Sequence, residues 1–293
     1  MKKHLKGALR IFIIVVTIAA FAYYVATHPE TVEQLKRMPI ALLFGLLAIY
    51  AISFLAYVAV TRGSLDMFEK KLPRQENILF NAYSTLVNFF APGQSGPAFR
   101  AIYLKKRHDL PIKKFVFATL LYLAFYAVLS LLLIGIGVLV WWQTLIILLA
   151  ATAGCVAALQ WYKKRSEFGK SLRIPLRSIA WIGVATAVQV LSIAFIYGAE
   201  LRSIDPSITP GQILAYTGVA NLALFVSITP GGIGIRESFL FISQGLHNIP
   251  DTTIVAASII DRAVYLLFLG LLFLLVIGLH AKDKLHVNQM KTE

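Results

Sequence analysis

Two apolar segments of the chain each combine a proline-glycine helix break with an arginine. Residues 92–96 read PGQSG and are followed by Arg100, and residues 230–234 read PGGIG and are followed by Arg236 and Glu237. Proline removes a backbone donor and glycine permits unusual dihedrals, so a helix breaks at both places. A helix that begins there has free N–H groups, and such helix ends bind phosphate. Because arginine also forks onto phosphate oxygens, the two segments together predict an anion site.

Two further charges lie within the last apolar segment of the chain. Asp261 and Arg262 lie ~14 Å into that segment at 1.5 Å per residue, near the middle of a bilayer. A charge at that depth costs at least about 2.5 kcal/mol and usually faces a partner or a cavity. We expect Arg262 to pair with Glu237, which would leave Asp261 or Arg236 for a ligand. The alternative is a buried ion-pair network that only holds helices together.

The predicted site draws on both halves of the chain. Asn88 and Asn221 precede the two breaks, and they would either bond the freed backbone, the role we favour, or contact a headgroup. In the first half, Tyr122 and Leu123 stand where the second half has its charged pair, so we expect an asymmetric site weighted to the second half. The predicted headgroup-binding residues are Asn88, Gly93, Gly96, Arg100, Asn221, Gly231, Gly232, Gly234, Arg236, Glu237, Asp261 and Arg262, with Pro92 and Pro230 as the helix breaks.

The composition is that of an integral membrane protein. The 293 residues are 58% hydrophobic, with a mean hydropathy of +0.74. About 20 apolar residues cross a bilayer. The N-terminal apolar stretch resembles a signal peptide but lacks a clear cleavage site, so we expect an uncleaved span. The six predicted spans are residues 8–27, 40–61, 115–141, 143–161, 178–199 and 252–279.

The positive charges indicate a membrane topology and not a nucleic-acid partner. The net charge is +14, but 23 of the 28 lysines and arginines fall in segments 1–10, 62–74, 100–114, 163–177 and 282–291. Placing these segments on one side satisfies the positive-inside rule, with both termini cytoplasmic. We therefore predict a multi-pass protein of a bacterial or archaeal cytoplasmic membrane. Cys155 is the only cysteine and the histidines have no metal-ligand spacing, so we expect no metal and no cofactor.

The order of segments predicts an inverted repeat within a single membrane domain, residues 1–293. Residues 78–107 and 210–249 each start and end on one side, so we interpret them as re-entrant hairpins. The order span, span, hairpin, span then recurs in halves at approximately 8–141 and 143–280, and an odd number of crossings per half inverts the second. Ala118 and Ala257 set a register of 139 residues. The fold class is thus all-α, with about six transmembrane helices and two re-entrant helical hairpins; the alternative is chance similarity among apolar segments.

At these residues the chain resembles the flippase-like transmembrane domain family of the lysylphosphatidylglycerol synthases, from about residue 10 to 280. PGGIGIRE at 230–237 is similar to the family's P-G-G-x-G-x-R-E signature, and residues 92–100 resemble its P-G-x-x-G-x-x-x-R segment. The resemblance implies a domain that flips a modified lipid across the membrane. The synthetic domain that loads lysine has no counterpart here, so no synthase activity is expected. The family's first half often has an arginine in its third span, where this chain has Tyr122 and Leu123.

We therefore expect a lipid translocase, not an enzyme, acting on an anionic phospholipid or a polyprenyl-phosphate lipid. A separate lipid-modifying enzyme and a second copy of the chain are the protein partners that this role would allow. One alternative is a membrane enzyme, or enzyme subunit, acting on a lipid-linked substrate, since Ser95 lies in a GQSG sequence like that of rhomboid proteases. Another is an ion or small-solute carrier, because such carriers also use inverted repeats with broken helices.

Overall fold

The computed structural model describes residues 38–91, 95–165, 175–226 and 234–289, together with Tyr23, Ala26, Thr27, Pro29, Glu33 and Lys36. Within these residues the secondary structure is helical and contains no strand. Residues 8–22 of the first predicted span lie outside the described residues. So do the break residues Pro92, Gly93, Pro230, Gly231 and Gly232.

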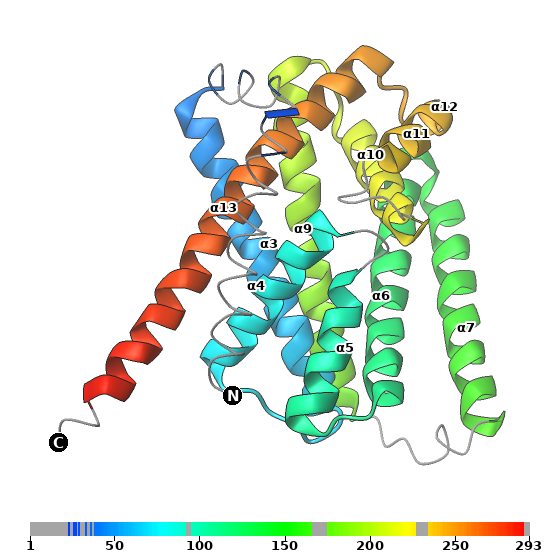
Figure 1. Ribbon diagram of the computed structural model, residues 1–293. Coiled ribbons are helices and arrows are strands. Elements are labelled where there is room, and N and C mark those ends of the chain that lie inside the picture. Colours follow the sequence, from blue (N-terminus) through cyan, green and yellow to red (C-terminus); the bar gives the residue numbers. More distant parts are fainter. Residues whose placement is uncertain are drawn as a thin grey trace.

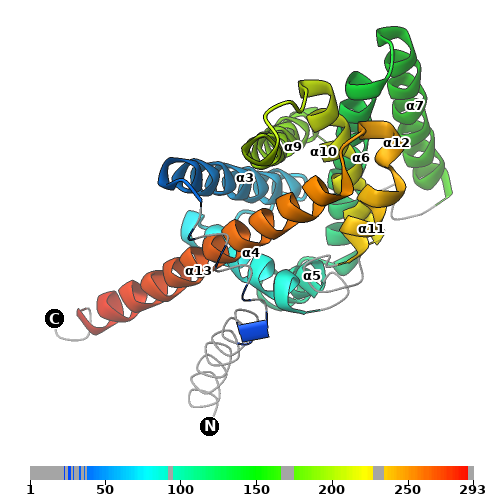
Figure 2. The ribbon, with the colours of Figure 1, turned by 90° about the horizontal axis from the view of Figure 1, so that it is seen from above.

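Four of the described helices are long and apolar enough to cross a membrane. They are α3 (Ile40–Asp66), α6 (Ile112–Val138), α9 (Leu176–Ile204) and residues 251–279 of α13 (Asp251–Gln289). At 1.5 Å per residue each is about 40 Å long, which exceeds the ~30 Å hydrocarbon core. They coincide with four of the predicted spans, which confirms a multi-pass membrane protein. The predicted span at 143–161 lies in α7 (Trp141–Arg165), which packs on α6 at the edge of the bundle (Figure 2).

Prolines set where several of these helices begin. Pro39 directly precedes α3, Pro111 precedes α6 and Pro175 precedes α9. A proline has no N–H to donate to an earlier turn, and it disfavours helical dihedrals in the residue before it. Each helix therefore starts cleanly after a connection, and the apolar residues that follow propagate it.

Two helical hairpins lie between the long helices and start from opposite ends of the bundle. The first is α4 (Arg74–Phe90) with α5 (Ser95–His108). The second is α10 (Pro210–Ala223), a 3₁₀ turn (Leu224–Val226), α11 (Ile235–Ile242) and α12 (Gln244–His247). Figure 1 shows α4 and α5 in the lower half and α10 to α12 near the upper end.

Each hairpin packs on a long helix of the other half. Helix α10 packs on α6, and α4 packs on α13, while α3 and α9 pack along each other. The contact between α6 and α10 depends on small residues: a Cβ on Gly218 would stand 2.5 Å from the Ser130 carbonyl, and one on Gly137 would meet the Gly211 carbonyl. Glycines at such positions let helix backbones approach closely, as in other membrane bundles.

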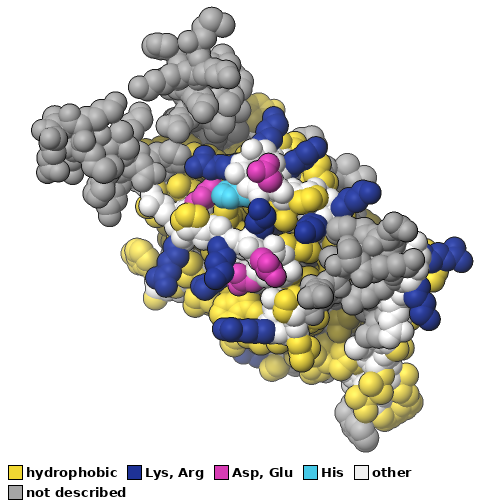
Figure 3. All heavy atoms as spheres, turned by 90° about the horizontal axis from the view of Figure 1, so that it is seen from below, with side chains coloured by type: hydrophobic (Ala, Val, Ile, Leu, Met, Phe, Trp, Pro, Cys, Tyr) yellow, Lys and Arg dark blue, Asp and Glu magenta, His cyan; other side chains and the backbone are white. Residues whose placement is uncertain are grey.

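The lower end of the bundle is strongly basic. Figure 3 shows lysine and arginine side chains gathered on this face around a few acidic ones. These exposed residues come from the ends of α3, α4, α5, α6, α7 and α9 and the connections between them: Arg62, Lys70, Lys71, Arg74, Lys105, Lys106, Arg107, Lys113, Lys164, Arg165 and Arg177. The end at which the first hairpin starts thus matches the side predicted to be cytoplasmic.

Candidate functional site

A cavity of about 410 Å³ lies between the two hairpins and the long helices. Its wall includes Asn88 and Pro97 from the first hairpin, Asn221 and Arg236 from the second, and Asp261 from α13. The volume falls within the range of known ligand sites. The fold thus brings residues that are more than 100 positions apart in the sequence to one cavity, which is lined by both polar and apolar side chains.

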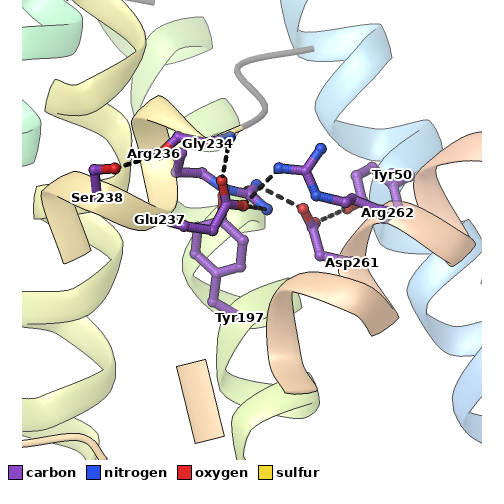
Figure 4. A network of polar contacts seen from close by, with 8 residues as sticks. All are labelled: Tyr50, Tyr197, Gly234, Arg236, Glu237, Ser238, Asp261 and Arg262. Carbon is purple, nitrogen blue, oxygen red and sulfur yellow. Dashed lines mark hydrogen bonds and ion pairs between the residues drawn. The ribbon is translucent and has the colours of Figure 1, made fainter. Parts of the chain in front are cut away.

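Four charged side chains of α11 and α13 form one network at this cavity (Figure 4). Arg262 Nη2 donates to Glu237 Oε1 at 2.6 Å, which is the predicted pair. Arg236 Nη1 donates to Asp261 Oδ2, also at 2.6 Å, and Arg236 Nη2 lies 3.5 Å from Glu237 Oε1. We expected Asp261 or Arg236 to remain for a ligand; in this arrangement the two are paired with each other, and their role toward a ligand stays a prediction.

Two tyrosines from the long helices hold this network in place. Tyr50 of α3 donates its hydroxyl to Asp261 Oδ1 at 2.5 Å, and Arg236 Nη1 donates to the Tyr197 hydroxyl of α9 at 3.1 Å. The guanidinium of Arg236 also lies over the Tyr197 ring, 5.8 Å from its centroid. Both tyrosines were missed in the sequence, because an aromatic residue inside an apolar span resembles any other core residue.

Glu237 has a second role at the start of α11. Its Oε2 accepts a hydrogen bond from the Gly234 backbone N–H at 2.8 Å. Gly234 has φ of +81°, a conformation that glycine adopts without strain, and this turns the chain into the helix. The carboxylate reaches back as in a capping box, so it occupies a backbone donor that we expected to be free for phosphate. The Glu237 carboxylate therefore occupies one of the backbone N–H groups at the N-terminus of α11 that a phosphate could otherwise bind.

Several donors around the network remain without an acceptor. Among the described residues, Arg236 Nε, Arg262 Nη1 and Asn221 Nδ2 are buried and make no hydrogen bond. Buried polar groups are normally paired, so each such donor calls for an explanation. The three residues that carry them line the cavity. An oxygen-rich anion is the kind of ligand that would satisfy them.

Arg100 lies outside the cavity, in a separate small pocket of about 20 Å³. Its side chain is buried, its guanidinium lies over the Tyr57 ring at 4.6 Å, and its Nη1 is 3.5 Å from Thr61 Oγ1. No carboxylate within the described part of the chain forms an ion pair with it. Tyr57 lines the large cavity and Tyr122 lines both spaces, so these two rings separate Arg100 from the charged network. The two arginines therefore do not share one site, contrary to expectation.

The first break is stabilised from within its own hairpin. Asn88 Oδ1 accepts a hydrogen bond from the Gly96 N–H at 3.3 Å, which is the structural role favoured for Asn88. Ser95 Oγ donates to the Val87 carbonyl at 3.1 Å. A Cβ on Gly96 would lie 2.7 Å from the Ser84 carbonyl, so only glycine fits there. The hydroxyl of Ser95 is thus engaged by backbone and not by a histidine base.

Glu76 closes the lower end of the first hairpin. Its Oε1 accepts from the Tyr103 hydroxyl at 2.6 Å and lies 2.9 Å from His108 Nε2 and 3.1 Å from Arg107 Nε. Burial raises the pKa of the Glu76 carboxyl, but the hydrogen bonds from Tyr103 and His108 outweigh it and lower that pKa overall. Burial and the same contact raise the pKa of Tyr103 to about 12. These contacts join the two ends of the hairpin.

Comparisons with known proteins identify the family of this chain. No match was found among curated proteins. The family model described as the lysylphosphatidylglycerol synthase TM region matches residues 8–272, a range that contains both hairpins and the whole charged network. The chain therefore belongs to the lysylphosphatidylglycerol synthase transmembrane-region family.

Proposed function

We propose that this protein is a lipid translocase, in which the headgroup of an anionic phospholipid, or of a polyprenyl-phosphate lipid, crosses the membrane through the cavity. The observation that carries the proposal is the network of four charges, three of which (Arg236, Asp261 and Arg262) line a cavity between the two hairpins. Two nitrogens of these arginines have no hydrogen-bond partner among the described residues. Charged residues at membrane depth commonly mark substrate pathways. The family membership adds a connection to lipid metabolism.

The proposed placement has six crossings, with the two hairpins re-entrant from opposite sides. The second half, 143–280, would repeat the first, 8–141, in inverted orientation, with the basic lower face and both termini in the cytoplasm. Local geometry supports the repeat. Arg100 lies over Tyr57 of α3 and Arg236 lies over Tyr197 of α9, and these tyrosines are 140 residues apart, close to the register of 139. The cross-packing of each hairpin on the other half supports it as well.

A phosphate group would bind by competing with Asp261 for Arg236. Without ligand, the two arginines balance the two carboxylates of the network. A headgroup phosphate would accept from Arg236 and from the unpaired Nη1 of Arg262, while Asp261 would keep its hydrogen bond from Tyr50. Bidentate arginine contacts with phosphate are short and strong, which favours the exchange. The cavity suits a headgroup, and the acyl chains would remain in the bilayer.

Flipping of labelled lipids in liposomes tests the proposal directly. Purified protein would be compared with Arg236→Ala and Glu237→Gln, using an anionic, an aminoacylated and a zwitterionic lipid. We expect the unmodified protein to flip the anionic lipid, the aminoacylated lipid or both, but not the zwitterionic lipid. The flipping rate should fall at least about tenfold in both variants, since each variant removes a charge of the network. Arg177→Ala is the matched control, because this exposed arginine lies on the basic face.

Two results would contradict the proposal. If Arg236→Ala flipped lipid like the unmodified protein, the site would be misplaced. If folded protein flipped no lipid at all, translocation itself would be wrong, and a role as an enzyme or enzyme subunit acting on a lipid-linked substrate would be the next hypothesis to test.

A further inference from the structure

Glu200 is a buried carboxyl that the headgroup site does not use. It lies near the end of α9, its side chain is 0% exposed, and it does not line the cavity. Neither of its oxygens has a hydrogen-bond partner among the described residues. An ionised carboxyl left in this way would lose its hydration without compensation, at a cost of several kcal/mol. A bound cation or a proton is what could neutralise it.

Among the described residues no group of three or more His, Cys, Asp or Glu could hold a metal ion, which leaves a proton as the ligand of Glu200. The only cation that interacts with it among the described groups is Arg236, which is already committed to Asp261. The other interacting groups are a second acid and three phenols, none of which supplies positive charge. The charged and titratable groups that act on Glu200 are Tyr50 on α3, Tyr197 on α9, Tyr216 on α10, Arg236 on α11 and Asp261 on α13.

The proposed repeat gives Glu200 a counterpart in the first half. Glu200 follows Thr61 by 139 residues, and Asp261 follows Tyr122 by the same number. Thr61 is the residue whose hydroxyl lies beside the guanidinium of Arg100. In the second half, Glu200 follows Tyr197 by three residues on α9, so the two side chains lie on the same face of that helix, and the Tyr197 hydroxyl accepts from Arg236. The carboxyl is thus built into the surroundings of the arginine that would hold the headgroup.

We propose that Glu200 is a proton-binding site, and that a proton bound there is required for tight binding of the anionic headgroup, so that lipid movement is coupled to protons. This inference rests on the proposed function. When a phosphate takes Arg236 from Asp261, one more negative charge enters a network that was balanced. An ionised Glu200 would add a further negative charge beside the same arginine. A proton on Glu200 removes that repulsion, so the proton and the anion favour each other's binding, as reciprocal linkage requires.

The pH dependence of anion binding tests the inference. The probe is a short-chain phosphatidylglycerol, titrated into purified protein from about pH 5 to about pH 8. We expect the affinity of the unmodified protein to fall as pH rises, approaching a tenfold loss per pH unit where Glu200 titrates, as linkage to one proton demands. Glu200→Gln cannot ionise and should bind tightly with a flat pH profile. Asp205→Asn changes an acid just beyond the end of α9 that accepts hydrogen bonds from Ser207, and it should behave like the unmodified protein.

The outcomes separate this inference from the proposed function. A flat profile for the unmodified protein, or an unchanged slope in Glu200→Gln, would refute the role of Glu200 while leaving headgroup binding in place. Absence of phosphatidylglycerol binding at every pH would refute the proposed function itself. If Glu200→Gln fails to fold, proton uptake by the unmodified protein in weak buffer decides: uptake when phosphatidylglycerol is added supports proton coupling, and its absence overturns it.

Discussion

Arg100 and Arg236 follow the two helix breaks in similar sequence contexts, yet the structure gives them opposite electrostatic surroundings. Both are buried and both lie over a tyrosine ring. Arg236 meets two carboxylates, whereas the neighbours of Arg100 are aromatic rings and the hydroxyl of Thr61. The difference originates on the last long helix of each half, because α13 supplies Asp261 where α6 supplies Tyr122. In one half the arginine thus belongs to an ion-pair network, and in the other it lies in a small pocket lined by aromatic rings.

Replacing each arginine by methionine should separate the two environments most clearly. Arg236→Met leaves Asp261 buried with a negative charge and only Tyr50 as a partner. Breaking one side of a buried pair costs about 3–5 kcal/mol, so we expect a loss of that size in the free energy of unfolding. Unfolding in mixed detergent micelles, followed by tyrosine and tryptophan fluorescence, measures it. A loss below about 1 kcal/mol would mean that the network contributes little to stability.

The hydroxyls of Tyr50 and Tyr122 provide the next contrast. Tyr50→Phe removes a donor to the Asp261 carboxylate, and hydrogen bonds to charged groups are worth about 1.5–3 kcal/mol. Tyr122→Phe removes a neutral hydrogen bond to Gln189 Oε1, worth about 0.5–1.5 kcal/mol. The same unfolding measurement should therefore rank Tyr50→Phe as the more damaging of the two. The reverse order would contradict the assignment of the charged network as the tightly organised region.

Arg100→Met should have a small effect on stability, in contrast to Arg236→Met. The substitution removes a buried cation without orphaning any carboxylate among the described residues, and methionine can fill the aromatic pocket. We expect a change within about 1 kcal/mol of zero, of either sign. A loss as large as that of Arg236→Met would reveal a partner for Arg100 beyond those described here.

The smallest effect concerns Glu76, at the base of the first hairpin. Because the folded protein lowers the pKa of this carboxyl, its ionised form stabilises the fold above the ordinary glutamate pKa of about 4.3. That contribution is lost as pH falls through the lower, folded pKa. Glu76→Gln should therefore be less stable than the unmodified protein near neutral pH, and the two should converge in acid. Thermal unfolding at several pH values tests this; a pH-independent difference would contradict it.

The sequence predicted the long helices and part of the charged site for identifiable reasons. Apolar runs of sufficient length specify membrane helices almost by themselves, and Arg262 and Glu237 paired as expected because few charges occur at that depth. The pairing of Asp261 with Arg236 was not predicted, since two arginines and two carboxylates can form ion pairs in more than one combination. Glu200 was missed because the predicted span ended at residue 199, whereas α9 continues to Ile204.

The separation of the two arginines could not be read from local motifs. Both breaks have the same spacing of proline and glycine and are followed within four residues by an arginine. The distinction between the two arginines depends on residues of another helix far along the chain. Tyr57 and Tyr122, which close the pocket of Arg100, carry no signal in an apolar span rich in aromatic residues. Only the packing of α3, α5 and α6 shows that they divide the interior.

The glycine contact between α6 and α10 has a consequence for how mutations will be tolerated. At Gly137, Gly211 and Gly218, a Cβ atom would meet backbone atoms of the partner helix. Backbone atoms cannot rotate away as the end of a side chain can, so even a methyl group would not fit there. In a saturation screen, these uncharged positions away from the cavity should score as severely as Arg236. A map of intolerant positions alone would therefore outline two regions, and only one of them would be the proposed lipid site.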